Sequence, residues 1–257
     1  MQRTIDGITY IIDIEKNEAA VKKAKKGITD ANILPMVEYR PVTKINKAAF
    51  KGQEELTNVT IPNTVKEIGS YAFYGCSNLN SIDIPDSVTE IGHTSFYFCE
   101  SLKSVKLPSF LSEIEACMFI RCYELKEIKI PTSVKAINNN AFWNCRNLLS
   151  VTIPDSVTYI GKKVFAACTS LKTVKLPYHL TEISKRTFGY CKSLETIEIP
   201  DCVTAIGEDA FHDCSNIKHV WFNSNLVNRP DADEIFSQMF KAGLKTREVL
   251  LRIPSKN

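Results

Sequence analysis

The sequence lacks long apolar runs and a marked excess of either charge. No run reaches the ~18 apolar residues that a membrane span requires, and the opening segment lacks the long uncharged stretch of a signal peptide. The net charge of +3 is small for a chain that grips nucleic acid. With 44% hydrophobic and 24% charged residues, the composition is that of globular proteins and excludes disorder. We therefore expect a soluble, folded protein that neither spans a membrane nor binds nucleic acid.

The motifs of common active sites and metal sites are also missing. The sequence contains no C-x-x-C, Walker loop, G-x-S-x-G, H-E-x-x-H or dinucleotide-binding fingerprint. Only His212, Asp213 and Cys214 bring residues of catalytic type together, and neighbours in sequence do not face one another in the way that a catalytic site requires. We therefore predict that the protein is not an enzyme and uses no cofactor or metal.

A repeat of 23 residues runs through most of the chain. Five columns keep this step: phenylalanine (Phe50 to Phe211), proline (Pro62 to Pro200), cysteine (Cys76 to Cys214), isoleucine (Ile45 to Ile206) and leucine (Leu56 to Leu194). The unit can be written L-x-x-V-x-I-P-x-x-V-x-x-I-G-x-x-A-F-x-x-C-x-x. One unit is too short to bury its own apolar residues, whereas stacked copies align each column into a shared core. The repeat therefore predicts a solenoid.

Each part of the unit predicts a local structure. The V-x-I segment, for example Val105 to Leu107, alternates inward and outward and favours a strand that pairs in parallel with its copies. Proline lacks an N–H group and should end each strand at the same place. The A-F-x-x-C segment is expected to form a helical turn. A left-handed backbone is expected in the glycine column, which comprises Gly69, Gly92, Gly161 and Gly207, with Asn46 and Asn138 at equivalent positions.

The two ends depart from the repeat. Thr9–Ile14 and Ala19–Ala24 are predicted to form a hairpin, and a helix is predicted from Pro230 to Gly243 because proline and acidic residues open it. We predict a single domain over residues 1–257. It comprises an N-terminal hairpin cap (1–40), about eight repeats (41–222) and a C-terminal capping repeat with a helix and a strand (223–257). This combination predicts an α/β repeat solenoid.

The repeat resembles that of a known family, the BspA-type leucine-rich repeats. Ala72 to Leu79 (AFYGCSNL), Ile84 to Gly92 (IPDSVTEIG) and Ile153 to Gly161 (IPDSVTYIG) are similar to the repeat of that family almost letter for letter. The resemblance covers about Pro41 to Trp221, and Gly7 to Val21 resembles the hairpin that precedes such repeats. It implies a right-handed leucine-rich-repeat coil. It also implies a non-enzymatic binding protein that serves adhesion at the cell surface.

Two outward columns beside the predicted strands are rich in lysine. Six of these residues form what we call the lysine band: Lys103, Lys106, Lys126, Lys129, Lys172 and Lys175. Their summed, salt-sensitive attraction would draw an acidic peptide or a polyanionic glycan to this face. Acidic residues interrupt the band, so the alternative is a solvated sheet surface whose lysines serve solubility.

Another outward column follows the phenylalanines and carries large residues over four consecutive coils. It holds Tyr74, Tyr97, Ile120 and Trp143, and Phe98 lies alongside. At ~4.8 Å per coil, these residues would form an aromatic stripe about 15 Å long. Such a stripe would anchor a partner protein or stack on sugar rings. The alternative is that the rings lie flat on neighbouring coils and merely cover the core.

Seven of the nine cysteines recur once per coil. Stacked equivalents should have Cβ atoms ~4.8 Å apart, beyond the ~3.5–4.5 Å of a disulfide, so we expect buried, unpaired thiols. Cys117 and Cys202 occupy columns that are otherwise mostly polar, and they are expected to be exposed and open to modification.

These patterns support two hypotheses of function. The first is a cell-surface scaffold that binds a protein or glycan ligand, with extracellular matrix among the expected ligands, through the lysine band or the aromatic stripe. The second is an intracellular scaffold for protein–protein interaction, because many free thiols suit a reducing compartment. Under both hypotheses we expect a monomer or a weak oligomer.

Overall fold

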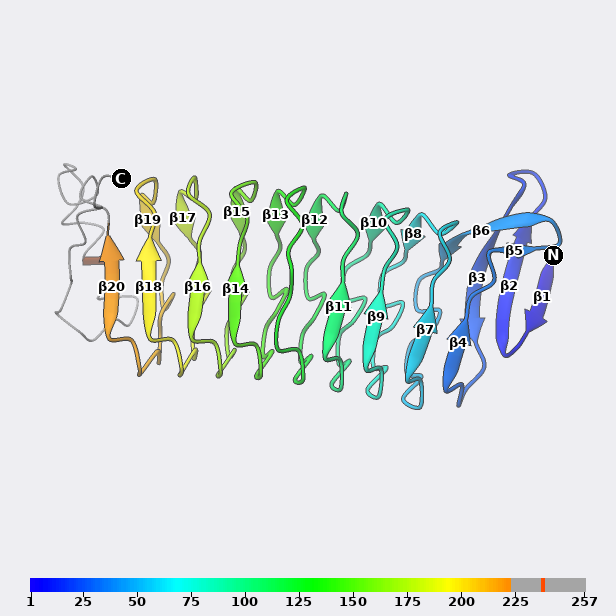
Figure 1. Ribbon diagram of the computed structural model, residues 1–257, viewed down its shortest axis with the longest axis horizontal. Coiled ribbons are helices and arrows are strands. Elements are labelled where there is room, and N and C mark those ends of the chain that lie inside the picture. Colours follow the sequence, from blue (N-terminus) through cyan, green and yellow to red (C-terminus); the bar gives the residue numbers. More distant parts are fainter. Residues whose placement is uncertain (223–236, 239–257) are drawn as a thin grey trace.

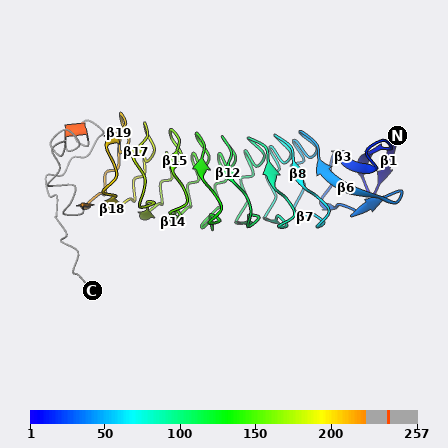
Figure 2. The ribbon, with the colours of Figure 1, turned by 90° about the horizontal axis from the view of Figure 1, so that it is seen from above.

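The computed structural model describes residues 1–222 and 237–238, and the described chain forms a long stack of coils (Figure 1). Seen from above, the coils follow one another along the long axis (Figure 2). One row of strands consists of β4 (Asp30–Asn32), β7 (Asn58–Thr60), β9 (Ser81–Asp83), β11 (Ser104–Lys106), β14 (Ser150–Thr152), β16 (Thr173–Lys175), β18 (Thr196–Ile199) and β20 (His219–Phe222). We call this row the strand face.

A second row runs along the opposite corner of each coil. It consists of β6 (Arg40–Ile45), β8 (Glu67–Ile68), β10 (Glu90–Ile91), β12 (Glu113–Ile114), β13 (Ala136–Ile137), β15 (Tyr159–Ile160), β17 (Glu182–Ile183) and β19 (Ala205–Ile206). Strands of both rows pair in parallel, and in the repeats each residue pairs with its copy one repeat away, as Ser150 does with Thr173. At the start of the stack, β4 and β7 pair at a longer spacing, as Asp30 does with Asn58. The register therefore explains the spacing of the repeat. On the strand face the strand pairing is interrupted twice, between β7 and β9 and between β11 and β14, where residues 127–129 form no strand.

The predicted hairpin is present at the N-terminal end. β2 (Ile8–Asp13) and β3 (Glu18–Ala24) are antiparallel, and β1 (Gln2–Ile5) adds a third strand to β2. β3 then pairs in parallel with β6, and β6 in turn pairs in parallel with β8. The short β5 (Met36–Val37) pairs with β6 in a second hairpin. The N-terminal strands are thus joined to the second row of the solenoid by backbone hydrogen bonds.

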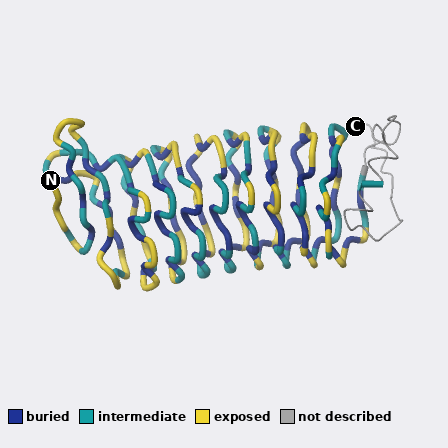
Figure 3. The backbone as a smooth tube through the Cα atoms, turned by 180° about the vertical axis from the view of Figure 1, so that it is seen from behind, coloured by how far each residue is buried: buried dark blue, intermediate teal, exposed yellow. Residues whose placement is uncertain are grey.

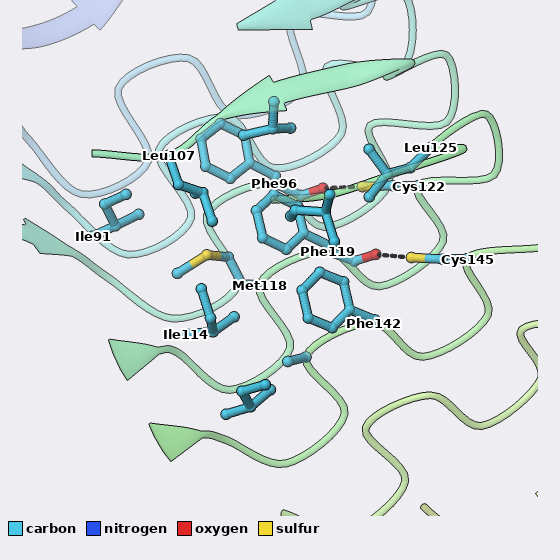
Figure 4. Packing of buried hydrophobic residues seen from close by; sticks show 14 of the residues in the cluster. Ile91, Phe96, Leu107, Ile114, Met118, Phe119, Cys122, Leu125, Phe142 and Cys145 are labelled. Atoms are coloured by element: carbon cyan, nitrogen blue, oxygen red, sulfur yellow. Dashed lines mark hydrogen bonds between the residues drawn. The ribbon is translucent and has the colours of Figure 1, made fainter. Parts of the chain in front are cut away.

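The core is a set of ladders made by the repeated columns. The eight phenylalanines from Phe50 to Phe211 are fully buried. Successive rings stack with centroids 5.1 to 5.8 Å apart and planes within 14° of each other. Figure 4 shows Phe96, Phe119 and Phe142 in this arrangement. Buried residues of all coils form one continuous cluster, and the exposed positions lie on the outside of the coils (Figure 3).

The predicted α/β class is not confirmed, since all elements from residue 1 to residue 222 are strands and, of the described residues outside that range, Ser237 and Gln238 alone are helical. The A-F-x-x-C segments form non-helical turns, so the predicted helical turn is wrong. In every described coil from Phe50 to Phe211, the residue two before the phenylalanine and the residue two after it have φ between 55° and 72°, as at Cys117 (59°) and Arg121 (60°) around Phe119. A right-handed helix requires negative φ, so it cannot continue through these positions. The predicted C-terminal helix lies outside the described residues, apart from Ser237 and Gln238, and so do the other features predicted beyond residue 222.

The glycine column has a different role from the predicted one. Neither Gly92 nor any of its equivalents has a positive φ. A Cβ atom on Gly92 would instead lie 2.4 Å from the backbone nitrogen of Ser70, and one on Gly207 would lie 2.4 Å from that of Lys185. At its four glycines, this corner therefore brings neighbouring coils too close for a side chain, whereas equivalents such as Asn138 carry one.

The cysteine column binds each coil to the preceding one. The thiol of Cys145 donates a hydrogen bond to the carbonyl oxygen of Phe119, with Sγ and oxygen 3.1 Å apart, and Cys122 does the same to Phe96 at 3.3 Å (Figure 4). All seven column thiols make this bond, at 3.0 to 3.3 Å. None of the nine cysteines, all within the described residues, forms a disulfide. The column thus supplies a small buried side chain and a donor for a backbone carbonyl.

Reaction of the native protein with DTNB is expected to modify Cys117 and Cys202 and to spare the seven column thiols. Both residues are partly exposed, and partial burial raises the pKa of the Cys117 thiol. Complete burial raises the pKa of Cys168 to about 12 and acts in the same direction on its equivalents. A thiol reacts as thiolate, so the buried thiols should react only after denaturant is added. Fast release from more than two thiols of the native protein would contradict this account. A Cys117→Ser, Cys202→Ser double variant is the control and should show no fast phase.

Candidate binding surfaces

The described residues contain no group of three or more histidine, cysteine or acidic side chains placed to hold a metal ion. Across the same residues, no helix is long and apolar enough to cross a membrane. The cluster at His212, Asp213 and Cys214 does not assemble a nucleophile. The Cys214 thiol points inward to the carbonyl oxygen of Phe188 at 3.0 Å, and burial raises its pKa to about 12. His212 faces Asp209 instead, with Nδ1 and Oδ1 3.8 Å apart.

All six residues of the lysine band are exposed on the strand face. Within the described part of the chain, none of them forms an ion pair. Lys103, Lys106, Lys126 and Lys129 lie on two adjacent coils, whereas the next coil carries the neutral Leu149 and Thr152 at the same positions. The structure thus divides the band into a group of four lysines and a group of two. Because the four are unpaired and adjacent, their fields add over two coils.

The pair formed by Lys172 and Lys175 lies beside side chains of the opposite charge. Lys175 lines a hollow of about 430 Å³ together with Tyr178, Asp155 and Glu198. In the following coil, Glu195 forms an ion pair with Lys218, with Oε2 and Nζ 3.6 Å apart. This end of the strand face is therefore mixed in charge. The group of four has acidic neighbours too, since Lys106 stands in register with Asp83 and interacts electrostatically with Asp86.

The first part of the aromatic stripe is closed by contacts within the protein. Tyr74 and Tyr97 stack with ring centroids 5.1 Å apart, and the edge of Phe98 meets Tyr97 at 4.3 Å. Lys51 covers Tyr74 with its Nζ 5.1 Å from the ring centroid, and the guanidinium of Arg121 lies 4.8 Å above Phe98. These cation–π contacts occupy ring faces that a partner would otherwise use. The three rings are half-buried.

The stripe does not continue evenly to Trp143. Ile120, between Tyr97 and Trp143, is buried at 4% exposure. Trp143 is half-buried, and its indole contacts neither an aromatic ring nor a cation among the described residues. It lines a hollow of about 240 Å³, which we call the Trp143 hollow: Asn140, Trp143, Lys163, Ala166, Arg186 and Tyr190.

The hollow exists because the stripe column becomes small after Trp143. The next two coils carry Ala166 and Gly189 at the positions where Tyr74 and Tyr97 stand earlier. Arg186 is held in place by Asp209, whose Oδ2 accepts hydrogen bonds from Nε at 2.9 Å and Nη2 at 2.7 Å. These hydrogen bonds raise the pKa of Arg186 and lower that of Asp209. Opposing changes of this kind keep both groups charged over the whole ordinary pH range.

Sequence reasoning identified Trp143 and missed the rest of the hollow. Asn140, Lys163 and Arg186 belong to the left-handed column two residues before the phenylalanines, with φ of 57°, 57° and 55°. Tyr190 belongs to the left-handed column two residues after them, with φ of 64°. Both columns turn side chains outward at the rim. These residues do recur at the 23-residue step, in two further columns of the repeat. The side chains within each column differ in chemical type, so the sequence alone did not indicate a binding site there.

Comparison with known proteins defines the class. The family described as the BspA type leucine rich repeat region matches residues 36–149 and 135–249, in six copies. The chain therefore belongs to the BspA-type leucine-rich repeat family.

The chain shares its fold with a solved leucine-rich repeat protein. The leucine-rich repeat protein of T. pallidum is 21% identical, with a TM-score of 0.60, over 97% of this chain and 99% of that one. A leucine-rich cell surface protein from Faecalibacterium prausnitzii A2-165 is 22% identical, with a TM-score of 0.45, over 100% of this chain and 95% of that one. A search of curated proteins found no match.

Proposed function

We propose that the protein is a non-enzymatic scaffold that binds a protein or glycan ligand on its outer surface. The observation that carries this proposal is the division of each coil into two sets of residues. The repeated columns are buried and make the core, whereas the outward positions differ from coil to coil and gather unpaired lysines on the strand face and aromatic rings on the turn side. Solenoids present extended surfaces of this kind to their partners.

The lysine band is the proposed site for an anionic partner. Four exposed lysines on two adjacent coils have no ion-pair partner among the described residues. Their charges add to the field above the strand face, and the acidic neighbours Asp83, Asp86 and Glu127 partly offset it. Attraction of this type is summed over the charges and is screened at high salt. An acidic segment of a protein or a sulfated glycan of the extracellular matrix fits this surface.

Family membership supports a place at the cell surface, where the protein would serve adhesion. A second candidate, an intracellular interaction scaffold, is favoured by the nine unpaired cysteines, because free thiols persist in reducing compartments. The two candidates differ in their partners. Capture of a matrix component supports the first, and salt-resistant capture of a cytosolic protein supports the second.

Reversal of charge at Lys106, Lys129 and Lys175 is expected to abolish capture of anionic ligands and leave folding intact. The three side chains are exposed, and surface substitutions usually change stability by less than about 0.5 kcal/mol each. The measurement is a pull-down of heparan sulfate and matrix proteins with the wild type and the Lys→Glu triple variant, at low and high salt. Urea denaturation of both proteins controls for folding.

The matched control reverses three exposed lysines outside the band: Lys66, Lys135 and Lys162. This variant has the same net charge as the band variant, so a loss confined to the band variant assigns binding to the strand face. Undiminished capture by the band variant, or an equal loss in both variants, would refute the lysine band as the site.

A further inference from the structure

We infer that the Trp143 hollow binds one carboxylate-bearing pyranose, an acidic sugar unit of a glycan. This inference rests on the proposed function, because it assumes that the outer surface carries ligands, and it assigns a ligand class to a site away from the lysine band. The hollow lies on the turn side of the coils, whereas the lysine band lies on the strand face.

The aromatic rings of the stripe differ in whether other rings and cations cover them. Tyr74, Tyr97 and Phe98 are engaged by one another and by the cations Lys51 and Arg121. Trp143 has neither kind of partner among the described residues and faces the hollow instead. An indole face left open in this way offers a large apolar area to a ligand at little cost in conformational entropy.

The gap between Trp143 and Tyr190 has the size of one sugar ring. Trp143 and Tyr190 come from coils two repeats apart, and the buried Ala166 of the coil between them forms the floor. Two steps of ~4.8 Å separate these walls by about 10 Å. Carbon atoms in contact lie about 3.5–4.0 Å apart, so this gap admits one puckered ring with contacts on both faces. Tyr190 is 42% exposed and is steadied by the edge of His212, with centroids 5.2 Å apart.

The rim of the hollow carries two basic side chains, Lys163 and Arg186. Lys163 is exposed and forms no ion pair with any described residue. Arg186 is oriented by Asp209 through Nε and Nη2, which leaves Nη1 for a ligand. No carboxylate lines the hollow. Lys163 is thus the unpaired cation of the rim, and Arg186, already ion-paired with Asp209, adds an oriented donor. Such a rim favours a ligand that carries an anionic acceptor, and a carboxylate matches an ammonium group and a guanidinium donor.

The backbone around the hollow favours a sugar over a peptide. The N–H groups of Asn140, Phe142 and Asn144 donate to the carbonyls of the next coil at 2.8 to 3.0 Å. In that next coil, the N–H groups of Lys163, Phe165 and Ala167 donate in turn to carbonyl oxygens of the following coil, with nitrogen and oxygen 2.7 to 3.0 Å apart. A peptide that binds in extended form needs free main-chain partners, and these groups are already paired. A pyranose needs only a flat apolar wall and side-chain donors, which the hollow provides.

The test is a titration of the whole protein followed by NMR of the two tryptophan indole N–H signals. The Trp143 signal is identified with Trp143→Phe. Trp221 lines the hollow beside Lys175 on the strand face, so its signal reports separately on binding at that face. The probes are a hyaluronan tetrasaccharide, which contains glucuronate, and 3′-sialyllactose, with neutral lactose and chitotetraose as comparisons. An acidic peptide of alternating glutamate and phenylalanine tests the other class of ligand.

The Trp143 signal is expected to shift with at least one acidic sugar, and binding of that sugar should be at least tenfold tighter than binding of either neutral one. Lys163→Gln should weaken it by about tenfold, since a charge-assisted hydrogen bond is lost, whereas Lys66→Gln, four coils away, should not. Which acidic sugar binds shows whether uronate or sialic acid is the source of the carboxylate.

Three outcomes overturn the inference: no shift of the Trp143 signal with either acidic sugar, equal binding of neutral sugars, or preference for the peptide. The result is separable from the proposed function. If the lysine band captures ligands but the Trp143 signal does not move, only the inference of sugar binding in the Trp143 hollow is refuted. Failure of both experiments refutes the binding of anionic and glycan ligands by this surface.

Discussion

Phe142→Ala is expected to lower the free energy of unfolding by about 3–5 kcal/mol, because it opens a cavity in the core. Phe142 is fully buried, and its ring stacks against Phe119 at 5.3 Å and Phe165 at 5.4 Å. Removal of the ring takes away contacts on both faces at once, and neighbouring coils cannot close the gap while their backbone hydrogen bonds hold the spacing. Urea denaturation followed by circular dichroism measures the effect.

The matched control is Phe110→Ala, which makes the same chemical change at a phenylalanine that is 70% exposed. A surface change of this kind should alter stability by less than about 0.5 kcal/mol. The difference between the two variants isolates the contribution of the phenylalanine ladder. Similar losses for both would show that the ladder is not what stabilises the stack.

Gly92→Ala is expected to destabilise the protein by about 1–3 kcal/mol through overpacking. The added Cβ atom would lie 2.4 Å from the backbone nitrogen of Ser70 and 2.7 Å from its Cα. Relief requires the two coils to move apart, and the hydrogen bond from the Gly92 N–H to the Ile68 carbonyl, at 2.7 Å, opposes that movement. Thermal and urea unfolding both report the change.

Gly189→Ala is the control for this effect. Gly189 has no positive φ, and the nearest atom to an added Cβ is 3.5 Å away, which is an ordinary contact. The substitution also reduces the entropy of the unfolded chain, so we expect a change between neutrality and a gain of about 1 kcal/mol. A loss at Gly189 as large as that at Gly92 would contradict the steric explanation.

The stack itself could be predicted from the sequence because the repeat imposes it. A column such as Phe50 to Phe211 has one physical explanation, a ladder of side chains at a constant spacing, and the strand register follows from the same period. The N-terminal hairpin was predicted to within one residue at each strand boundary for similar reasons, since alternation and a polar turn mark it.

The turns could not be predicted in the same way. Positions such as Tyr71, Thr94 and Lys163 are left-handed although none is glycine or asparagine. Their conformation is set by the need to reverse the chain within one coil, which overrides local preference. The prediction of a left-handed backbone at the glycine column was wrong for a related reason. These glycines avoid a clash with the preceding coil, and such a contact between coils cannot be read from local sequence.

The candidate site was only partly accessible to sequence reasoning. Periodicity indicated which residues point outward, so the lysine band and Trp143 could be named. It could not indicate that Lys51 and Arg121 cover the first aromatic rings, or that Lys163, Arg186 and Tyr190 meet around Trp143. Those contacts depend on side-chain directions in turns whose backbone conformation the pattern did not reveal.

The central claim is that inward columns build the solenoid and outward residues bind its ligands. Adjacent residues test it most directly, because Phe142 is fully buried whereas Trp143 lines a surface hollow. We would measure the free energy of unfolding and ligand binding of Phe142→Ala and Trp143→Ala side by side. The account predicts that Trp143→Ala loses at most about 1 kcal/mol of stability and loses binding of the acidic sugar, against about 3–5 kcal/mol for Phe142→Ala. Equal losses of stability, or full binding by Trp143→Ala, would contradict it.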